Sequence, residues 1–339
     1  MNLKRIGLLL IVIILAGVAF YLYKNKSIDK NKSYDFSYRD FPVENIDDIG
    51  TIMLYRRDGN TIKLSKQGEN WSVNDNYPAD KMMVRNLISV IKNIRIEYVP
   101  PESSNENILK EMAYGGIKTE IFDKNGNLLK SYYVGGSPQN SVGTYFVMTG
   151  SGSPLVMSMP GFNGNLKVRF SYTEDEWRDK TVFAIQPENI QEIKMHYLIS
   201  ENESFLLKRT DNGFIISDIA KKSPDIKINS EYADTYLLGY KEKGCEYIEN
   251  TMLEKDEVLS KAPIVELDIK LKAGTNKNLK IYMLPRLEEE IQDDKQGIDK
   301  YLNQNILRYI AQNEKGDLFL IQYEVFQDLF VRKNWFFKN

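Results

Sequence analysis

The same residue pattern occurs twice along this 339-residue chain. The segment Asn45–Ile49 returns as Asn189–Ile193, 144 positions later, and further matches keep a spacing that changes only where loops are expected. These matches pair Leu64, Trp71, Val73 and Asp75 with Leu207, Phe214, Ile216 and Asp218, and Val84, Leu87, Ile88 and Ile91 with Ala233, Tyr236, Leu237 and Tyr240. A repeat of this kind indicates one module copied head to tail. Two unrelated domains of similar composition are the alternative.

Each copy combines short strands with an amphipathic helix. In the first copy, residues 80–95 carry apolar side chains at three- and four-residue spacing, which predicts a helix. Asp58-Gly59-Asn60 and Asn125-Gly126 are hairpin turn signals between apolar runs. The expected strands are 51–55, 61–66, 71–73, 117–123, 128–134, 145–149 and 155–159, with short helices at 104–112 and before Trp177. The predicted fold is α+β: two tandem repeats of antiparallel β-sheet with packed helices, at 42–183 and 184–339.

One N-terminal transmembrane helix is expected to precede the two repeats. Residues 6–23 (Ile6 to Tyr23) contain no charge, and as a helix they would cover about 27 Å, close to the thickness of a bilayer core. Residues 1–5 would form a cytoplasmic tail and residues 24–41 a polar tether. A cleaved signal peptide, with Gly17 and Ala19 at the cleavage site, is the alternative. Because both copies follow the tether, a chain lacking residues 1–26 is expected to fold and stay soluble.

The orientation in the membrane has two opposing signals. The lysines that follow the apolar run, Lys24, Lys26, Lys30 and Lys32, would hold the large domain in the cytoplasm if the positive-inside rule is applied literally. A short basic start followed by an apolar run is instead the usual architecture of an export signal. We expect the globular part to lie outside the cytoplasmic membrane.

Composition removes several classes of function. Lys and Arg number 45 against 47 Asp and Glu, so the net charge of −2 gives no footprint for nucleic acid. A single His and a single Cys leave no metal cluster and few acid–base schemes. We therefore expect no catalytic residues, no metal and no cofactor, and so a protein that is not an enzyme. No pattern in the sequence indicates an oligomeric state.

Single residues that carry chemistry have ordinary structural explanations. His196 lacks a neighbouring nucleophile motif, and Cys245 aligns with Ile96 of the first copy, an apolar position. The carboxylates of 174–176 are expected to remain solvated. Arg178 and Arg332 occupy matching places at the ends of the copies, where each is expected to tie a helix to its own sheet. A ligand carboxylate or a partner protein is the alternative partner for Arg178.

The first copy has a glycine-rich loop without a counterpart in the second. Loops free of core packing often carry function, and a plain hairpin loop is the competing interpretation. The candidate ligand or partner contacts are Gly135, Gly136, Tyr145, Gly161, Phe162, Trp177 and Arg178. The second copy carries an acidic insertion near 286–305, expected to be a solvated charged segment, because its spacing does not match an oxygen-ligand loop for calcium.

Four segments of the chain resemble the DUF4340 family of bacterial envelope proteins. They are Trp177–Ile193 (WRDKTVFAIQPENIQEI), Pro42–Leu54, Gly68–Asp80 and Gly143–Met148. The resemblance implies a repeated α+β protein anchored at its N-terminus in the bacterial inner membrane, single-pass and periplasmic, without an established activity. It supplies no catalytic motif. Relatives are often encoded beside ABC-type transport components of the gliding-motility kind.

Two functions are compatible with these patterns. One is a membrane-anchored interaction or auxiliary component of an envelope assembly, which docks to an envelope protein partner. The other is an envelope ligand-binding module for a glycan or peptide, using the loops around Gly135 and Gly161. A hydrolase is a more distant third interpretation.

Overall fold

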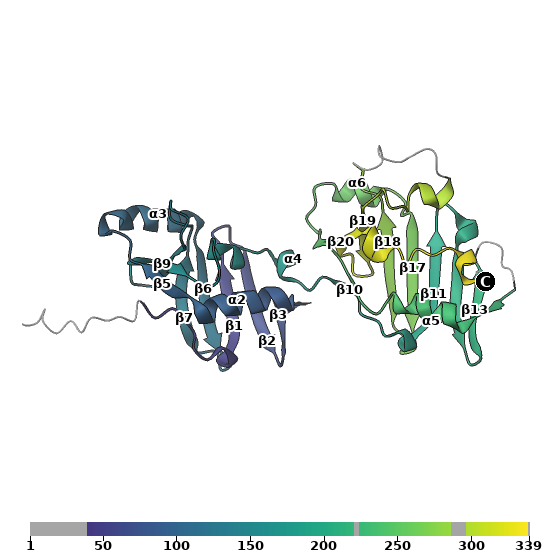
Figure 1. Ribbon diagram of the computed structural model, residues 1–339, viewed down its shortest axis with the longest axis horizontal. Coiled ribbons are helices and arrows are strands. Elements are labelled where there is room, and N and C mark those ends of the chain that lie inside the picture. Colours follow the sequence, from purple (N-terminus) through teal and green to yellow (C-terminus); the bar gives the residue numbers. More distant parts are fainter. Residues whose placement is uncertain (1–38, 220–223, 286–295, 338–339) are drawn as a thin grey trace, which may run out of the picture. The chain divides into compact units, whose positions relative to one another are not determined.

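The computed structural model describes residues 39–219, 224–285 and 296–337. Two nine-stranded, mainly antiparallel sheets dominate these residues (Figure 1). The described residues up to Thr61 and Leu87–Ser171 form one compact unit, and Ile62–Asn86 with Tyr172–Asn339 form a second unit. The boundary at residues 183 and 184, inferred from the repeat, stays a prediction.

The strands of the first sheet follow the order β4-β3-β2-β1-β6-β7-β8-β9-β5. They are β1 (Ile49–Tyr55), β2 (Thr61–Gln67), β3 (Asn70–Val73), β4 (Tyr77–Pro78), β5 (Arg95–Tyr98), β6 (Ile117–Asp123), β7 (Leu128–Val134), β8 (Thr144–Met148) and β9 (Pro154–Ser158). The sequence predicted most of these strands within about two residues, and it missed β4 and β5. Both missed strands are short edge strands.

The second sheet has the order β14-β13-β12-β11-β17-β18-β19-β20-β16, which is the order of the first sheet position by position. Its strands are β11 (Ile190–Tyr197), β12 (Phe205–Thr210), β13 (Gly213–Asp218), β14 (Ile226–Ile228), β16 (Tyr247–Ile248), β17 (Val265–Leu271), β18 (Asn276–Tyr282), β19 (Arg308–Asn313) and β20 (Leu318–Gln322). A small separate sheet pairs β10 (Thr181–Phe183) with β15 (Lys243–Gly244).

The strand registers agree with the sequence repeat. Leu64 pairs with Val73 across β2 and β3, and their counterparts Leu207 and Ile216 pair across β12 and β13. All four side chains are buried. A shift of one residue would turn each side chain to the other face of its sheet, so the matching registers mean that the matched residues occupy the same places in the two sheets.

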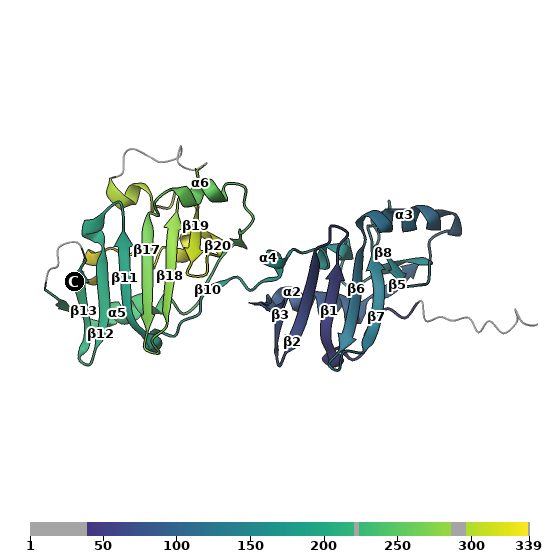
Figure 2. The same ribbon diagram turned by 180° about the vertical axis from the view of Figure 1, so that it is seen from behind.

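Helix α2 (Lys81–Asn93) forms where the sequence predicted it. Asp80 Oδ1 accepts hydrogen bonds from the backbone N–H groups of Met82 (2.8 Å) and Met83 (3.0 Å), which caps the helix. Its buried face carries Val84, Leu87, Val90 and Ile91, followed by Ile94 just past the helix end. Figures 1 and 2 together show α2 lying across one face of the first sheet and α5 (Ser230–Leu238) across one face of the second.

The hairpin turns follow their sequence signals. Gly126 adopts a φ of 85°, and Asp123 Oδ1 accepts from the backbone N–H groups of Asn125 and Asn127 at 2.8 Å each. Positive φ is costly for residues with a Cβ, so the glycine fixes this turn and with it the register of β6 and β7.

The remaining helices are short. They are α3 (Asn105–Gly115), α4 (Glu174–Trp177), α6 (Lys255–Ser260) and α7 (Tyr323–Phe326), together with the 3₁₀ turns η3 (Ile46–Asp48), η4 (Glu102–Ser104), η5 (Leu166–Arg169), η6 (Pro187–Asn189), η7 (Glu201–Glu203), η9 (Gly297–Lys300) and η10 (Lys333–Phe337). Helix α3 confirms the short helix predicted at 104–112, and η5 and α4 precede Arg178 as expected.

Two features differ from the sequence expectations. Phe41, placed at the end of the tether, is buried against Tyr132 (5.6 Å between ring centroids) and Phe146 (5.9 Å). The carboxylates of 174–176, expected to remain solvated, form the first turn of α4, where Glu176 is exposed and Glu174 and Asp175 are half-buried. A capping box between Thr173 and Glu176 satisfies the backbone N–H groups of these two residues.

The N-terminal expectations fall outside the described residues. These are the tail at 1–5, the anchor at 6–23 and the tether up to residue 38, and the same holds for 286–295 of the acidic insertion. Among the helices that the structure describes, none has the length and apolar character needed to cross a membrane.

Candidate functional site

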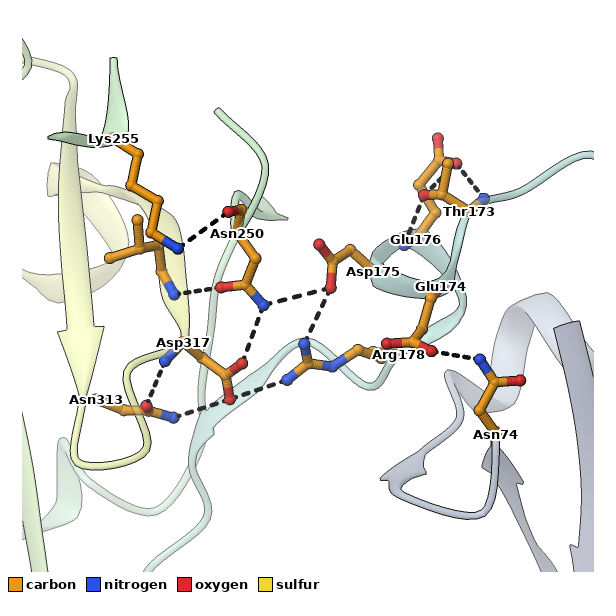
Figure 3. A network of polar contacts seen from close by, with 11 residues as sticks. Asn74, Thr173, Glu174, Asp175, Glu176, Arg178, Asn250, Lys255, Asn313 and Asp317 are labelled. Carbon is orange, nitrogen blue, oxygen red and sulfur yellow. Dashed lines mark hydrogen bonds and ion pairs between the residues drawn. The ribbon is translucent and has the colours of Figure 1, made fainter. Parts of the chain in front are cut away.

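A buried arginine lies at the centre of a network of polar contacts in the second unit (Figure 3). Arg178 follows α4 directly and is 5% exposed. Its Nη1 lies 3.0 Å from Asp175 Oδ1, and its Nη2 lies 2.9 Å from Asp317 Oδ2 on the turn before β20. The guanidinium also lies 3.7 Å from the ring centroid of Tyr77. Both ends of the guanidinium fork and one of its faces therefore have a partner.

A second set of contacts holds the two carboxylates. Asn250 Nδ2 donates to Asp317 Oδ1 at 3.0 Å, while Asn250 Oδ1 accepts from the backbone N–H of Leu318 at 2.8 Å. Burial raises the pKa of Asp317, but the hydrogen bonds from Asn250 and Arg178 outweigh it and leave that pKa below its usual value. Asp317 is therefore ionised at neutral pH, and the cluster acts as a structural clamp.

The partner of Arg178 corrects one expectation. The sequence predicted that Arg178 ties its helix to the sheet of its own copy. Its guanidinium does stack on Tyr77 of β4, but its longer-range ion pair goes to Asp317, beside β20. Arg332, at the matching place, pairs with the exposed Asp299 at 2.5 Å and lies 4.9 Å from the Tyr197 ring centroid. Both arginines combine an aromatic ring with a carboxylate. Arg178 also lines a hollow of about 400 Å³, but both of its terminal nitrogens already have carboxylate partners.

Trp177, the other candidate on α4, is fully buried. Its ring meets Tyr172 edge to face at 5.4 Å. This position makes Trp177 a packing residue of the second unit.

The glycine-rich loop residues pack against α3. A Cβ on Gly135 would lie 2.7 Å from Met112 Cγ, and one on Gly136 would lie 2.9 Å from Glu111 Oε1. Tyr145 packs with Ile108 and Met112. Close approach of the helix therefore explains Gly135 without a ligand, whereas the Glu111 side chain could move away from a Cβ at Gly136.

Gly161 and Phe162 lie elsewhere. Gly161 has a φ of 77° with open space around it, as expected of a turn glycine. The ring of Phe162 lies under the guanidinium of Arg169, at 4.9 Å. Of the seven candidate residues, the five of the first unit thus fall into two separate places, and Trp177 and Arg178 belong to the second unit.

His196 and Cys245 have structural surroundings. His196 Nδ1 lies 3.7 Å from Glu266 Oε2 on the neighbouring strand β17. Within the described ranges, no group of three potential metal ligands converges.

The thiol of Cys245 is expected to be unreactive. Burial raises its pKa to about 12, although Lys180 and Arg178 act in the opposite direction. Because the thiolate is the nucleophile, alkylation by iodoacetamide near pH 8 should be roughly a thousandfold slower than for a free cysteine. Mass spectrometry of native and urea-unfolded protein measures both rates. Equal rates would contradict a buried thiol.

Sequence inspection missed a groove in the second unit. Two adjoining hollows, of about 390 and 460 Å³, share Gln304, Tyr323 and Gln327. We call this surface the amide groove. The first hollow is also lined by Leu307, Arg308, Gln322 and Glu324, and the second by Gln296, Asp299, Leu302 and Asn303.

The amide groove is built from the connection before β19 and the segment after β20. In the second sheet, residues 283–307 connect β18 to β19, whereas residues 135–143 make the equivalent connection in the first. The insertion that looked like a solvated charged segment therefore supplies one wall of the groove through residues 296–307. The greater length of this connection in the second copy was the sequence feature that could have indicated the groove.

Polar contacts hold the rim of the groove in place. Arg308 Nε lies 2.7 Å from Glu246 Oε2, and Gln322 Nε2 donates to the same oxygen at 3.0 Å. Hydrogen bonds from Arg308 and Gln322 lower the pKa of Glu246. Gln304 is exposed, and its amide makes no hydrogen bond to other residues of the described chain.

Comparison with known proteins gives one match. A family model described as a domain of unknown function, DUF4340, matches residues 71–242, just over half of the 339 residues. No curated protein and no solved structure matches the chain. The matched segment includes strands of both nine-stranded sheets. On this evidence the chain belongs to the DUF4340 family.

Proposed function

We propose that this protein is a non-catalytic, membrane-anchored component of an envelope assembly, and that its amide groove docks a polypeptide segment of another envelope protein. The observation that carries the proposal is the groove itself. A segment found only in the second copy builds it on an otherwise matching sheet. Duplicated modules keep their core positions, so the surface that differs is the place to look for a specialised contact.

The contacts of Arg178 and the protonation of Cys245 support a role without catalysis. Arg178 is paired with Asp175 and Asp317 and stacked on the Tyr77 ring. The raised pKa of Cys245 keeps its thiol protonated. Neither residue is available to attack a substrate or to transfer a proton near neutral pH.

The chemistry of the amide groove fits an extended polypeptide. Side-chain amides such as that of Gln304 offer both a donor and an acceptor, which match the N–H and C=O groups of a backbone. Leu307, 62% exposed, provides an apolar contact at the same place. A glycan site would favour an open aromatic face, but the Tyr323 ring is half-buried and stacked on Phe330 (6.4 Å, 27°).

The position in the cell completes the proposal. Ile6 to Tyr23 would anchor the chain in the inner membrane as a single span, with the globular part in the periplasm. The assembly would be of the ABC-type transport or gliding kind. This placement rests on the apolar run and on the family resemblance.

Blocking the amide groove should release the chain from its assembly. Gln304→Trp, or separately Leu307→Arg, places a bulky or charged side chain in the groove. In membranes solubilised with mild detergent, the wild-type chain is expected to migrate on native gels in a complex larger than the chain alone, and each variant should migrate as the chain alone. Leu253→Arg is the matched control, because Leu253 is 99% exposed and does not line the groove.

Two results would contradict the proposal. One is a complex of unchanged size in both groove variants. The other is retention of the purified chain on isolated cell-wall glycan that Gln304→Trp abolishes, because this would make the occupant a glycan.

A further inference from the structure

The first unit contains a pocket of about 530 Å³ that is rich in positive charge. The turn after β1 contributes Arg56, Arg57 and Asp58, and the end of α3 contributes Tyr114, Gly115 and Gly116. Lys167 of η5 lines the same pocket. Three cations and one carboxylate therefore surround it, which leaves a net charge of about +2.

The cations are only partly engaged. Arg56 Nε lies 3.5 Å from Asp58 Oδ2, and its Nη1 donates to the Ser171 carbonyl at 3.2 Å. Arg57 donates from Nη1 to the Ala113 carbonyl at 3.4 Å, and its guanidinium lies 4.4 Å from the Tyr114 ring centroid. Within the described ranges, neither Arg57 nor Lys167 has a carboxylate at ion-pair distance.

Capping of α3 accounts for part of this arrangement but not for all of it. A cation near a helix C-terminus is favourable, and Arg57 fills that role through the Ala113 carbonyl. The same helix end favours the charge of Lys167, but among the described residues its ammonium has neither a hydrogen bond nor an ion pair. A Cβ built on Gly115 would meet only Lys167 Nζ, at 3.6 Å. The ammonium thus faces a glycine that leaves the space in front of it open.

We propose that this pocket binds the phosphate group of a phosphate monoester. Lys167 and Arg57 would supply the charge-assisted hydrogen bonds, and Gly115 the space. A monoester carries close to two negative charges at neutral pH, which balances the net charge of the pocket, and the arginine fork and the lysine ammonium are both established phosphate donors. A soluble phosphate ester and a lipid headgroup that ends in a monoester share this chemistry.

The test uses the full chain in nanodiscs of phosphatidylcholine, with glycerol 3-phosphate as the soluble probe. Acylation of lysines, mapped by mass spectrometry, is expected to slow at least fivefold at Lys167 when the probe binds, and to stay unchanged at the exposed Lys92. A parallel sample replaces the soluble probe with phosphatidic acid in the disc. Protection there identifies a lipid headgroup as the source of the phosphate, and protection by glycerol 3-phosphate alone identifies a soluble ester.

Calorimetry then measures the affinity for the probe that protects Lys167, and variants test how this affinity depends on the charge of the pocket. Lys167→Gln is expected to weaken binding at least about tenfold, and Lys110→Gln, an equal charge change on α3 outside the pocket, should leave it unchanged. Gly115→Asp places a carboxylate near Lys167 and should weaken binding about as much, whereas the similarly sized Gly115→Asn should weaken it far less.

Three results would overturn the proposal. They are the absence of protection at Lys167 with both phosphate sources, equal protection by succinate, and equal losses of affinity for Gly115→Asp and Gly115→Asn. The groove experiments above involve the second unit, so either proposal can fail while the other stands.

Discussion

Replacing Arg178 with methionine is expected to lower the free energy of unfolding of the second unit by about 3–5 kcal/mol. Methionine keeps much of the apolar stem but removes the guanidinium, so Asp175 and Asp317 lose a shared cation in a cluster that is largely shielded from water. The contact with the Tyr77 ring is lost as well. A buried charge without a partner costs more than the pair contributes when intact, which explains the size of the effect.

Tryptophan fluorescence during urea unfolding measures this change. Trp71, Trp177 and Trp335, the three tryptophans of the chain, all belong to the second unit, so the signal reports on that unit in a chain lacking residues 1–26. Arg178→Lys keeps the positive charge but not the planar guanidinium that binds both carboxylates. It should therefore recover only part of the lost free energy of unfolding. A loss below about 1 kcal/mol for Arg178→Met would mean that the cluster is not a clamp.

The pH dependence of the free energy of unfolding gives a second measurement on the same cluster. The pKa of Asp317 in the folded chain lies below its usual value of 3.8, because hydrogen bonds to the carboxylate outweigh burial. The ion pair therefore stabilises the fold above about pH 4 and loses that effect as the pH falls through the lowered pKa. The difference in the free energy of unfolding between wild type and Arg178→Met should therefore shrink as the pH falls below about 4. If this difference stays constant down to about pH 2, the ionised carboxylate of Asp317 does not stabilise the fold through Arg178.

Phe336→Ala is expected to destabilise the second unit by about 3–5 kcal/mol. Phe336 is 2% exposed and meets three aromatic rings: Phe205 at 5.1 Å, Trp335 at 5.2 Å and Tyr236 at 5.4 Å between centroids. Removing the ring leaves a cavity that this cluster cannot fill, because Tyr236 is also fixed by hydrogen bonds to Tyr240 (2.7 Å) and to the Leu329 carbonyl (3.2 Å). The urea experiment described for Arg178 measures the loss.

The neighbouring residue supplies the matched control. Phe337 is 40% exposed, so Phe337→Ala removes the same ring from the same turn and should cost less than about 1 kcal/mol. Equal effects for the two substitutions would show that the C-terminal turn does not pack as described.

Local signals predicted much of each sheet. Asn125-Gly126 defined the hairpin of β6 and β7, and the spacing of Leu87 and Ile91 defined helix α2, because turn geometry and helical periodicity depend on neighbouring residues. The repeat extended the pattern to the second copy. Strands β5 and β16 were not predicted, because short edge strands depend on pairing with distant partners more than on their own composition.

The sites were predicted less well, for a physical reason. The ion pair of Arg178 with Asp317 joins residues far apart in the sequence, and a single sequence contains no local signal for such a pair. The same holds for the cationic pocket, where Arg57 and Lys167 come from separate elements. The glycines of the 135–143 loop looked functional because they lack counterparts, whereas the structure explains Gly135 by the close approach of α3.

The most direct test of the central claim is photo-crosslinking at the amide groove in intact spheroplasts. A photoreactive residue replaces Leu307 in one version of the chain and Leu253 in another, and crosslinked proteins are identified by mass spectrometry. We predict one dominant envelope protein, joined through an extracytoplasmic segment, from position 307 and not from position 253, with loss of the crosslink in Gln304→Trp. Identical crosslinks from both positions, or a partner that is confined to the cytoplasm, would contradict the account.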